Sequence, residues 1–577
     1  MRRLFLLILL LFAIPFVGKP QQKRPAILTP FERSNGKESA TWEEAIDFYR
    51  TLASKDNRIS IKKVGEADGR FPLYLVVYSA SHSPTTSEQV TILINNGIHA
   101  GEPDGVDASM MLLRDISEGK ITIPDNVILA IVPVYNVGGF VNRGRFSRVN
   151  QNGPLEYGFR GNGQNLDLNR DFIKCDAVET VSLEGVFTAL DPDVFIDNHV
   201  SDGADYQHVM TLLPTQHDKL GGQTGDFMYK TFTPKIYKDM KKVGYDLVPY
   251  VNDFDNTPVN GWREFIEPPR FASGYAALFQ TIAYVPETHV LKPFKDRVVA
   301  NLELMKCIIN EASQHAATIK KVRAADMDFL IHQQLFPLDW KIDSTRHDDI
   351  TFKGYAAKYK TSEVSGLPRL YYDREEPFTK IVPFYDHYIP SKTVTAPKAY
   401  IIPQVWEDVI YRLRMNGAEM EQLKNDTSIT VSAYHIDNYE TGGKPYEKHY
   451  LHKNVQVTSH KVIMNFRKGD YIIWVNKYQR AKRYIIETLE PTAPDAFLAW
   501  NFFDGILQQK EYFSDYVFED VAAGLLKKDA SLKQMLEEKK QSDSVFAKSS
   551  AAQLDFVYRH SPYMEPGYMR YPVYRLE

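Results

Sequence analysis

The stretch Asn95-Asn96-Gly97-Ile98-His99-Ala100-Gly101-Glu102 decides the fold of the first half of this 577-residue chain. It follows the apolar run 90–94, which is typical of a buried strand, and it precedes a helical pattern over 104–116. His99 and Glu102 therefore lie where a strand ends and a helix begins, and this edge of an α/β sheet usually holds ligands. A His and a Glu three residues apart can supply two of the three protein ligands of a catalytic zinc ion. An isolated match of this kind is more commonly a polar loop, so the rest of the chain has to support it.

The length and composition indicate a folded protein of more than one domain. A chain of 577 residues exceeds the size of one hydrophobic core, so we expect two or more domains. Hydrophobic residues make up 44% and charged residues 25%, which is typical of a globular protein. The net charge of -4 gives no electrostatic reason to expect nucleic acid as a partner.

The N-terminus has the pattern of a secretory signal. Met1-Arg2-Arg3 precedes the apolar run 4–17, which is too short to span a bilayer comfortably. We expect a signal peptide over residues 1–18, cleaved near Gly18, and hence a secreted or periplasmic protein with no stable membrane insertion after cleavage. Phe16 stands where a small residue is preferred, so an uncleaved anchor is the alternative.

The only two cysteines, Cys175 and Cys307, lie far apart in the sequence. Neither has the spacing of a metal site. We expect two buried free thiols rather than a disulfide bond.

Secondary-structure patterns change character along the chain. In the first part, apolar runs that predict strands alternate with helical patterns, which favours an α/β sheet containing a βαβ unit. These strand runs are 59–64, 73–79, 90–94, 127–134, 193–197 and 282–285. A long helical pattern over 294–323 closes this part, so we predict a first domain over 25–325.

Beyond residue 326, strand-like alternation dominates and predicts a β-rich accessory domain over 326–577. The strand patterns are 352–359, 429–435, 455–466, 471–475 and 484–487. One amphipathic helix is expected over 405–423 and another over 514–526. The fold class is therefore α/β for the first domain, followed by a β-rich second domain.

A third metal ligand is expected at the end of another strand. His199 follows the strand 194–197 and stands 97 positions after Glu102, so it can reach the same sheet edge from a different strand. His208 and His217 are rivals that lie further from the strand end. The alternative for His199 is a loop histidine paired with a neighbouring aspartate, Asp197 or Asp202.

Polar residues between these ligands suit substrate binding. In the stretch 165–172, the pair Asn169-Arg170 could hold a carboxylate, because the planar guanidinium matches it with two hydrogen bonds. Asp167 could accept the free N–H of a ligating histidine and fix its tautomer. An ordinary polar loop is the alternative. Upstream, three arginines share a loop, and one of them aimed at the metal would stabilise an oxyanion; they are Arg143, Arg145 and Arg148.

Glu287 follows the strand 282–285 and has the chemistry of a general base. A carboxylate near a zinc-bound water can take its proton and later deliver a proton to the leaving amine. An ion pair with Lys292 or Lys295 is the alternative role.

Taken in order, these motifs resemble the zinc carboxypeptidase family of the carboxypeptidase A type over residues 40–320. The resemblance implies a compact domain with a mixed, largely eight-stranded sheet and one catalytic zinc ion per chain. It implies hydrolysis of the C-terminal peptide bond of a peptide substrate with a free C-terminal carboxylate.

The resemblance also implies a role for each matching residue. The zinc ligands would be His99, Glu102 and His199, with Asp167 supporting His99. Glu287 would be the general base and acid, and Arg148 the oxyanion stabiliser. Substrate would be bound by Asn169, Arg170 and Arg145, with Tyr275 as the candidate for the family's mobile tyrosine. Tyr275 stands only 12 positions before Glu287, and no position matches the base of the specificity pocket.

Other functions share some of these features. A zinc amidohydrolase that removes an acyl group from an amino acid, similar to aspartoacylase-like proteins, also has Gly-x-His-x-x-Glu and Asn-Arg elements. A hydrolase of cell-wall peptides is a variant of the peptidase hypothesis. An inactive peptide- or glycan-binding protein, with the β-rich domain as the binding module, is the alternative of a different class.

Overall fold

The structure is a computed structural model that describes residues 27–80, 89–252 and 258–577. The predicted signal peptide, residues 1–18, lies outside these residues. Within the described part of the chain, no helix is both long enough and apolar enough to cross a membrane.

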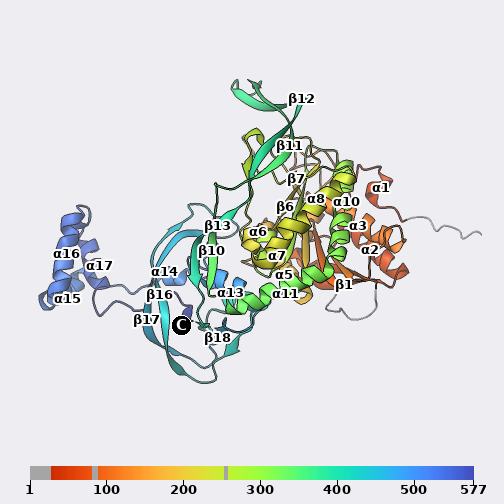
Figure 1. The fold of residues 1–577 in the computed structure, drawn as a ribbon. Helices are drawn as coiled ribbons and strands as arrows, with labels where there is room; N and C mark the ends of the chain where they lie inside the picture. The colour runs from red at the N-terminus through yellow and green to blue at the C-terminus, as the bar shows by residue number, and fades with distance from the viewer. Residues whose placement is uncertain (1–26, 81–88, 253–257) are drawn as a thin grey trace, which may run out of the picture.

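A mixed eight-stranded sheet forms the centre of the first domain (Figure 1). Its order is β1-β2-β4-β3-β5-β9-β6-β7. The strands are β1 (Ile59–Glu66), β2 (Pro72–Ser79), β3 (Val90–Asn96), β4 (Val127–Val132), β5 (Val194–Ser201), β6 (Met210–Pro214), β7 (Val248–Pro249) and β9 (Ile282–His289). The four central strands β4, β3, β5 and β9 are parallel, while β2 and β6 pair antiparallel with the outer two of them. The mixed α/β sheet expected from the sequence is confirmed.

Both faces of this sheet are covered, which is why its central strands are apolar throughout. Successive side chains of a strand point to opposite faces. Ile92 and Ile94 of β3 therefore pack in a core with the helices α2 (Trp42–Lys55), α3 (Asp104–Ser117) and α10 (Phe294–Gln314). Leu93 points to the other face, which is covered by α5 (Val178–Leu190) and α9 (Ala272–Ala277).

Several shorter elements complete the first domain. They are α1 (Pro30–Arg33), α4 (Val137–Val141), α6 (His217–Leu220), α7 (Gly222–Phe227) and α8 (Thr233–Lys242), with a π-helical turn at Met228–Phe232 and 3-10 turns at Asp68–Arg70, Leu168–Arg170 and Pro258–Asn260. The helical pattern over 294–323 forms two helices, because α10 ends at Gln314 and α11 spans Ala316–His332. The predicted boundary at 325 lies inside α11, so we use His332 as the end of the first domain.

The second domain is built mainly from antiparallel strands, as predicted. A two-stranded sheet pairs β10 (Leu335–Ile342) with β13 (Tyr388–Thr395), and the hairpin of β11 (Asp348–Thr361) and β12 (Pro368–Tyr385) projects beyond the rest of the molecule (Figure 1). The short strand β8 (Trp262–Arg263) of the first domain joins the end of β12. A six-stranded sheet has the order β15-β18-β14-β19-β16-β17. Its strands are β14 (Ala399–Ile402), β15 (Glu421–Gln422), β16 (Thr427–Thr441), β17 (His452–Phe466), β18 (Tyr471–Trp474) and β19 (Tyr574–Leu576).

The helices of the second domain differ in part from those predicted. The predicted helix over 405–423 is shorter, because α12 spans Glu407–Met415 and Gly417 then adopts a positive φ of 76°. The predicted strand 484–487 is wrong: these residues lie in α13 (Lys482–Leu489), which is buried along its whole length. A short apolar run cannot distinguish a buried strand from a buried helix.

The C-terminal part of the second domain carries further helices. The predicted helix 514–526 is confirmed as α15 (Asp515–Lys528), which packs with α16 (Ala530–Ser542) and α17 (Ser550–Arg559) around a small core of its own. A single turn, α14 (Gly505–Gln508), precedes them. These helices form a separate lobe at the left of Figure 1.

The two domains share one hydrophobic core. The face of the central sheet covered by α5 and α9 belongs to the same cluster of buried side chains as α12, α13 and the segment 496–507. At this junction the Tyr275 hydroxyl donates a hydrogen bond to Asn416 Oδ1 at 2.6 Å, and Asn416 Nδ2 donates to Glu184 Oε2 at 2.7 Å. Cys175 lies in the same region, and it and Cys307 are buried free thiols, as expected.

Candidate active site

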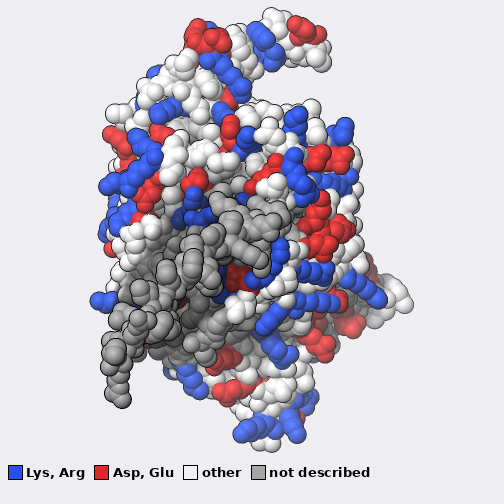
Figure 2. All heavy atoms as spheres, turned by 90° about the vertical axis from the view of Figure 1, so that its right-hand side faces the viewer, with Lys and Arg blue, Asp and Glu red and all other residues white. Residues whose placement is uncertain are grey.

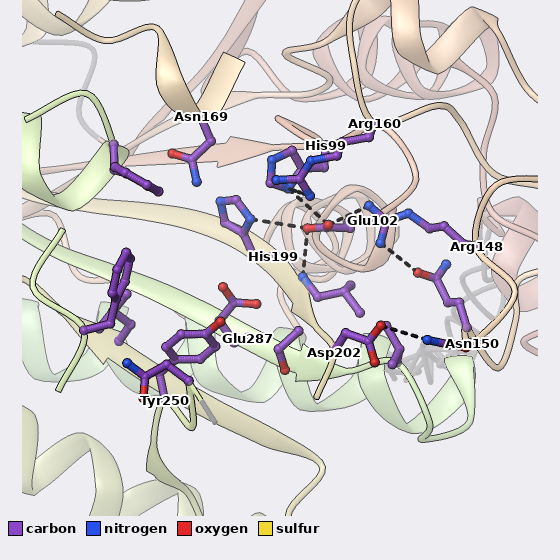
Figure 3. Close-up of a pocket in the computed structure, with 18 of the residues that line it drawn as sticks. His99, Glu102, Arg148, Asn150, Arg160, Asn169, His199, Asp202, Tyr250 and Glu287 are labelled. Carbon is purple, nitrogen blue, oxygen red and sulfur yellow. Dashed lines mark hydrogen bonds and ion pairs between the residues drawn. The ribbon is translucent and has the colours of Figure 1, made fainter. Parts of the chain in front are cut away.

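The predicted zinc ligands and the predicted general base converge at the carboxyl ends of three neighbouring strands (Figure 3). His99 and Glu102 follow β3, His199 lies near the end of β5, and Glu287 lies near the end of β9. His199 and Glu287 are directly paired in the parallel register of β5 and β9. The main-chain ladder therefore fixes the relative position of these side chains.

The two imidazole rings and the carboxylate form a compact, buried group. His99 Nδ1 is 3.1 Å from Glu102 Oε1, and His199 Nδ1 is 3.3 Å from Glu102 Oε2. The ring centroids of His99 and His199 are 4.9 Å apart. All three side chains are at most 4% exposed. Each histidine thus presents its Nδ1 atom to the same small volume.

An aspartate holds the opposite nitrogen of each histidine. His99 Nε2 is 3.0 Å from Asp167 Oδ1, and His199 Nε2 is 2.8 Å from Asp197 Oδ2. Asp197 and His199 are two positions apart in β5, which places both side chains on one face of the strand. A carboxylate on the outer nitrogen fixes the tautomer so that the inner nitrogen carries the lone pair that a metal ion needs. Asp167 lies within hydrogen-bond distance of His99, for which the sequence analysis expects a supporting role.

Glu102 is held in its ionised form by several partners. Arg148 Nη2 donates to Glu102 Oε1 at 2.7 Å, and the main-chain N–H of Val200 donates to Oε2 at 2.9 Å. Burial alone would raise the pKa of Glu102, but His99 and Arg148 outweigh it and hold that pKa well below its usual range. A side chain at position 101 would collide with the Arg148 guanidinium, so Gly101 is required for this approach.

These residues fit a catalytic zinc ion. One ligand atom each from His99, Glu102 and His199 lies within 4.8 Å of the other two. Two imidazoles and one carboxylate are a common ligand set of zinc hydrolases, in which a further position stays open for water. The oriented Nδ1 atoms provide the geometry, and the ionised carboxylate provides the charge.

Glu287 faces the same cavity, which has a volume of about 790 Å³ (Figure 3). Leu213, Tyr250 and Phe265 are among the residues that line the cavity with it. Burial raises the pKa of Glu287 to about 8, and the negative charge of Glu102 adds to this effect while His199 opposes it. A carboxyl group in such an environment can exchange a proton near neutral pH.

Asn169 and Arg170 also line this cavity. The Arg170 guanidinium lies 4.0 Å from the centroid of the Phe271 ring and donates one hydrogen bond to the Asn169 carbonyl oxygen at 2.7 Å. Asn169 Oδ1 accepts the N–H of Ala272 at 3.2 Å, so its amide group is anchored by α9. Stacking and anchoring orient both residues, while further N–H groups of Arg170 remain for a ligand.

Two residues that were predicted to bind substrate lie outside the cavity. The Arg145 side chain is 72% exposed and pairs with Glu156 at 3.3 Å, so only Arg148 of this pair faces the cavity. Tyr275 is 0% exposed, because α9 packs against the shared core and directs this side chain to Phe172, Phe187 and Phe279. The expectation that Tyr275 contacts substrate is therefore corrected. The tyrosine that lines the cavity is Tyr250.

Three other residues at the site were not singled out by the sequence analysis. Arg160 binds Asp167 Oδ2 through Nε at 3.1 Å and Nη2 at 2.7 Å and lines the cavity. Glu267 is another lining residue, whose carboxylate accepts the Ser273 hydroxyl at 2.7 Å. Glu447, from the loop between β16 and β17, accepts the main-chain N–H of Asp167 at 2.9 Å. Arg160 stands in a glycine-containing loop, but no sequence pattern connects Glu447 with a residue 280 positions away.

One face of the molecule carries charges of both signs (Figure 2). On the face shown in Figure 2, basic and acidic side chains are interspersed wherever the surface is described. This distribution agrees with the net charge of -4 and gives that face no extended basic patch.

Comparisons with known proteins identify the class of the chain's sequence relatives as carboxypeptidases. No protein-family model matches the chain. It is 20% identical over 515 residues to carboxypeptidase 2 of Trichophyton rubrum, a match that covers 85% of this chain and 89% of the relative. It is also 20% identical over 510 residues to the probable carboxypeptidase 2 of Arthroderma benhamiae, covering 82% and 89%. These homologues agree with the resemblance to the zinc carboxypeptidase family seen in the motifs.

Two solved structures of carboxypeptidases are similar to part of this chain. A metallo-carboxypeptidase from Burkholderia cenocepacia is 16% identical, with a TM-score of 0.36 over 48% of this chain and 70% of that chain. The carboxypeptidase A from Helicoverpa armigera is 14% identical, with a TM-score of 0.37 over 50% of this chain and 74% of that chain. We draw nothing about function from likeness at these TM-scores.

Proposed function

We propose that this protein is a zinc metallocarboxypeptidase that removes the C-terminal residue of peptides outside the cytoplasm. The observation that carries the proposal is the convergence of two ligand histidines, Glu102, Glu287 and the Asn169–Arg170 pair on one cavity. The curated relatives named carboxypeptidase 2 support the same reaction class. The N-terminal sequence pattern supports export.

Substrate binding would begin with the terminal carboxylate. Arg170 would bind it through two parallel hydrogen bonds and Asn169 would add a side-chain amide donor, because both line the cavity and both are anchored. This contact fixes the distance between the carboxylate and the peptide bond that is cleaved. Cleavage at the last peptide bond is thus a result of positioning.

The chain's own groups would then move the protons. Glu287 would accept a proton from the attacking water and afterwards donate a proton to the departing amine, so the C–N bond breaks and a new carboxylate forms. Arg148 faces the cavity and uses Nη2 for Glu102 and Nη1 for Gln151, which leaves further guanidinium N–H groups for the developing oxyanion. Zinc bound by His99, Glu102 and His199 would lower the pKa of water and polarise the carbonyl group.

Product analysis by mass spectrometry tests this proposal. Zinc-loaded protein is incubated with a mixed pool of peptides and N-acyl amino acids, beside a Glu287→Gln variant. We expect loss of single C-terminal residues with the wild type and not with the variant.

The other outcomes separate the alternatives. Acyl release from N-acyl amino acids would indicate an amidohydrolase, and internal cleavage would indicate an endopeptidase of the cell-wall type. No product together with no bound zinc would indicate an inactive peptide- or glycan-binding protein.

A further inference from the structure

A second cavity, of about 590 Å³, lies where the base of the β11–β12 hairpin meets the first domain. Its wall is formed by α6, the π-helical turn at Met228–Phe232, α8, the start of β11 and the end of β12. In Figure 1, α6 and α7 lie near β13, and α6 is in contact with this strand. The cavity is therefore part of the junction between the two domains.

Two histidines and three aspartates gather at this junction. His217 and Asp218 begin α6, Asp348 begins β11, and Asp386 and His387 form the turn between β12 and β13. One ligand atom each from His217, Asp218 and His387 lies within 4.8 Å of the other two. The same holds for Asp348, Asp386 and His387, so His387 belongs to both groups.

The two imidazole rings meet at close range. The centroids of His217 and His387 are 5.2 Å apart with an interplanar angle of 89°. His217 Nε2 is 3.4 Å from Asp218 Oδ2, and the His217 ring is stacked on Tyr229 with centroids 4.0 Å apart. Tyr229 in turn donates its hydroxyl to Asp348 Oδ2 at 2.8 Å. These contacts hold the rings and the carboxylates in defined orientations.

Several buried polar atoms at this junction have no hydrogen-bond partner among the described residues. His387 is 6% exposed and its Nδ1 atom is unpaired. Asp386 is 5% exposed, and its Oδ1 atom accepts no hydrogen bond, with His387 Nε2 at 3.6 Å. Unpaired buried groups of this kind are costly to a fold, and coordination of a cation is one way to satisfy them.

The charges at the junction also favour a cation. Besides the three aspartates, the buried Glu264 lines the cavity, and its Oε2 atom is likewise unpaired.

We propose that His217, Asp218 and His387 bind a divalent transition-metal ion, with zinc as the best match, which joins the second domain to the first. Two imidazoles and a carboxylate suit zinc, whereas Ca²⁺ and Mg²⁺ prefer oxygen ligands alone. Asp348 and Asp386 form a second group with His387, and their negative charges would help to balance the charge of the ion. The ion would link α6 to the β12–β13 turn, so its role is structural and separate from the cavity that contains Glu287.

Metal content distinguishes this site from the candidate active site. The full-length protein and its variants are loaded with Zn²⁺ alone, dialysed, and measured by inductively coupled plasma mass spectrometry. We expect two zinc ions per chain in the wild type, one in the His217→Asn/His387→Asn variant and one in the His99→Asn/His199→Asn variant. Removal of all four histidines should leave none.

The controls distinguish failure of the junction site from failure of the proposed carboxypeptidase function. His347→Asn, a histidine of the same hairpin base that pairs with Asp349, should keep two zinc ions. One zinc ion in the wild type that is lost only in the His99→Asn/His199→Asn variant would overturn the junction site and leave the proposed function intact. Two zinc ions that persist in the His217→Asn/His387→Asn variant would also overturn it.

A measurement on the unchanged protein guards against variants that fail to fold. Crystals of the zinc-loaded wild type, measured at the zinc absorption edge, should give an anomalous peak between His217 and His387. A peak between His99 and His199 alone would overturn the junction site.

Discussion

The two histidine–carboxylate clusters of this protein are built in opposite ways. His99, Glu102 and His199 come from adjacent strands of one sheet, and an aspartate holds the outer nitrogen of each histidine. His217 and His387 come from different domains, and buried polar atoms at the junction have no hydrogen-bond partner within the part of the chain that the structure describes.

The two clusters differ in the stage of folding at which their side chains come together. The main-chain ladder that pairs β5 with β9 also sets the position of His199 against Glu287, so the first cluster is formed as soon as its sheet is formed. The second cluster exists only once α6 and the β12–β13 turn have docked. A site that performs chemistry benefits from the first arrangement, because its groups must be held before substrate arrives. A site that joins two domains needs the second.

The largest expected effect is on kcat and follows from a change at Glu287, the proposed general base beside the first cluster. Glu287→Gln should lower kcat by about 10²–10⁴-fold, because an amide cannot accept the proton of the attacking water. Zinc content should stay as in the wild type, since Glu287 is not among the predicted ligands. Glu303→Gln, which alters a carboxylate of α10 that pairs with Lys306, is the matched control. Turnover near the wild-type rate would remove Glu287 from the mechanism.

The pH profile tests whether the same carboxylate is coupled to a metal ion. Burial raises the pKa of Glu287 to about 8 without metal, and a nearby divalent cation should lower it by favouring the charged form. A base must be deprotonated, so kcat/KM should fall as the pH drops through this pKa, by roughly tenfold per pH unit. For the zinc-loaded protein we expect the acid limb below pH 8. An acid limb at or above pH 8 would contradict this coupling.

The aspartates behind the histidines should have an intermediate effect. Asp167→Asn and Asp197→Asn should each weaken zinc binding by about 10–100-fold, because the ligating imidazole loses the partner that fixes its tautomer. Competition with a chelator measures the affinity. Asp202→Asn is the control, since Asp202 lines the same cavity but bonds to Asn150 and the Gly203 N–H. Unchanged affinity in both variants would show that the aspartates do not orient the ligands.

The substrate-binding arginine should show a smaller and selective effect. Arg170→Lys keeps the charge but loses the planar pair of donors, so KM for peptides with a free C-terminus should rise by about tenfold. The ratio between free-acid and C-terminally amidated peptides separates this role from general damage. If both kinds of peptide are affected equally, Arg170 does not bind the terminal carboxylate.

The smallest expected effect is on stability alone. Tyr275→Phe removes the hydrogen bond to Asn416, so the free energy of unfolding should fall by about 1 kcal/mol. Values of kcat/KM should remain unchanged, because Tyr275 is buried between the domains. Chemical denaturation and steady-state kinetics on the same preparation provide both quantities, and Tyr250→Phe on the cavity wall is the matched comparison. A loss of kcat/KM with unchanged stability would indicate that Tyr275 contacts the substrate.

Sequence reasoning located the first cluster because its residues follow apolar runs closely. The ends of such runs are visible in a sequence, and His99, His199 and Glu287 stand within five positions of them. Strand alternation also explains why Asp197 reaches His199. Tyr275 was misplaced because a position before Glu287 in the order of motifs does not show which side of α9 a side chain takes.

Contacts between the domains could not be predicted in the same way. Glu447 bonds to the first domain from a connecting loop without a periodic pattern. Asn416 does so from the end of α12, where the helical pattern does not reveal a partner in another domain. His217 was visible only as a weaker rival of His199, since its partner His387 stands on a β-turn of the other domain. The run 484–487 was predicted as a strand but lies in the buried helix α13, because a short apolar run does not distinguish these two forms.

The hydrophobic core that both domains share has a consequence for how such a protein changes over generations. A shortened gene ending near residue 325 would leave one face of the central sheet, with Tyr275 and its aromatic neighbours, without the side chains that cover it. Loss of the second half would therefore lower the stability of the first half, even if every catalytic group were retained. The matches to the Trichophyton and Arthroderma proteins, which cover 82–85% of this chain, extend well beyond the first half. Matches that span both halves agree with a core to which both halves contribute.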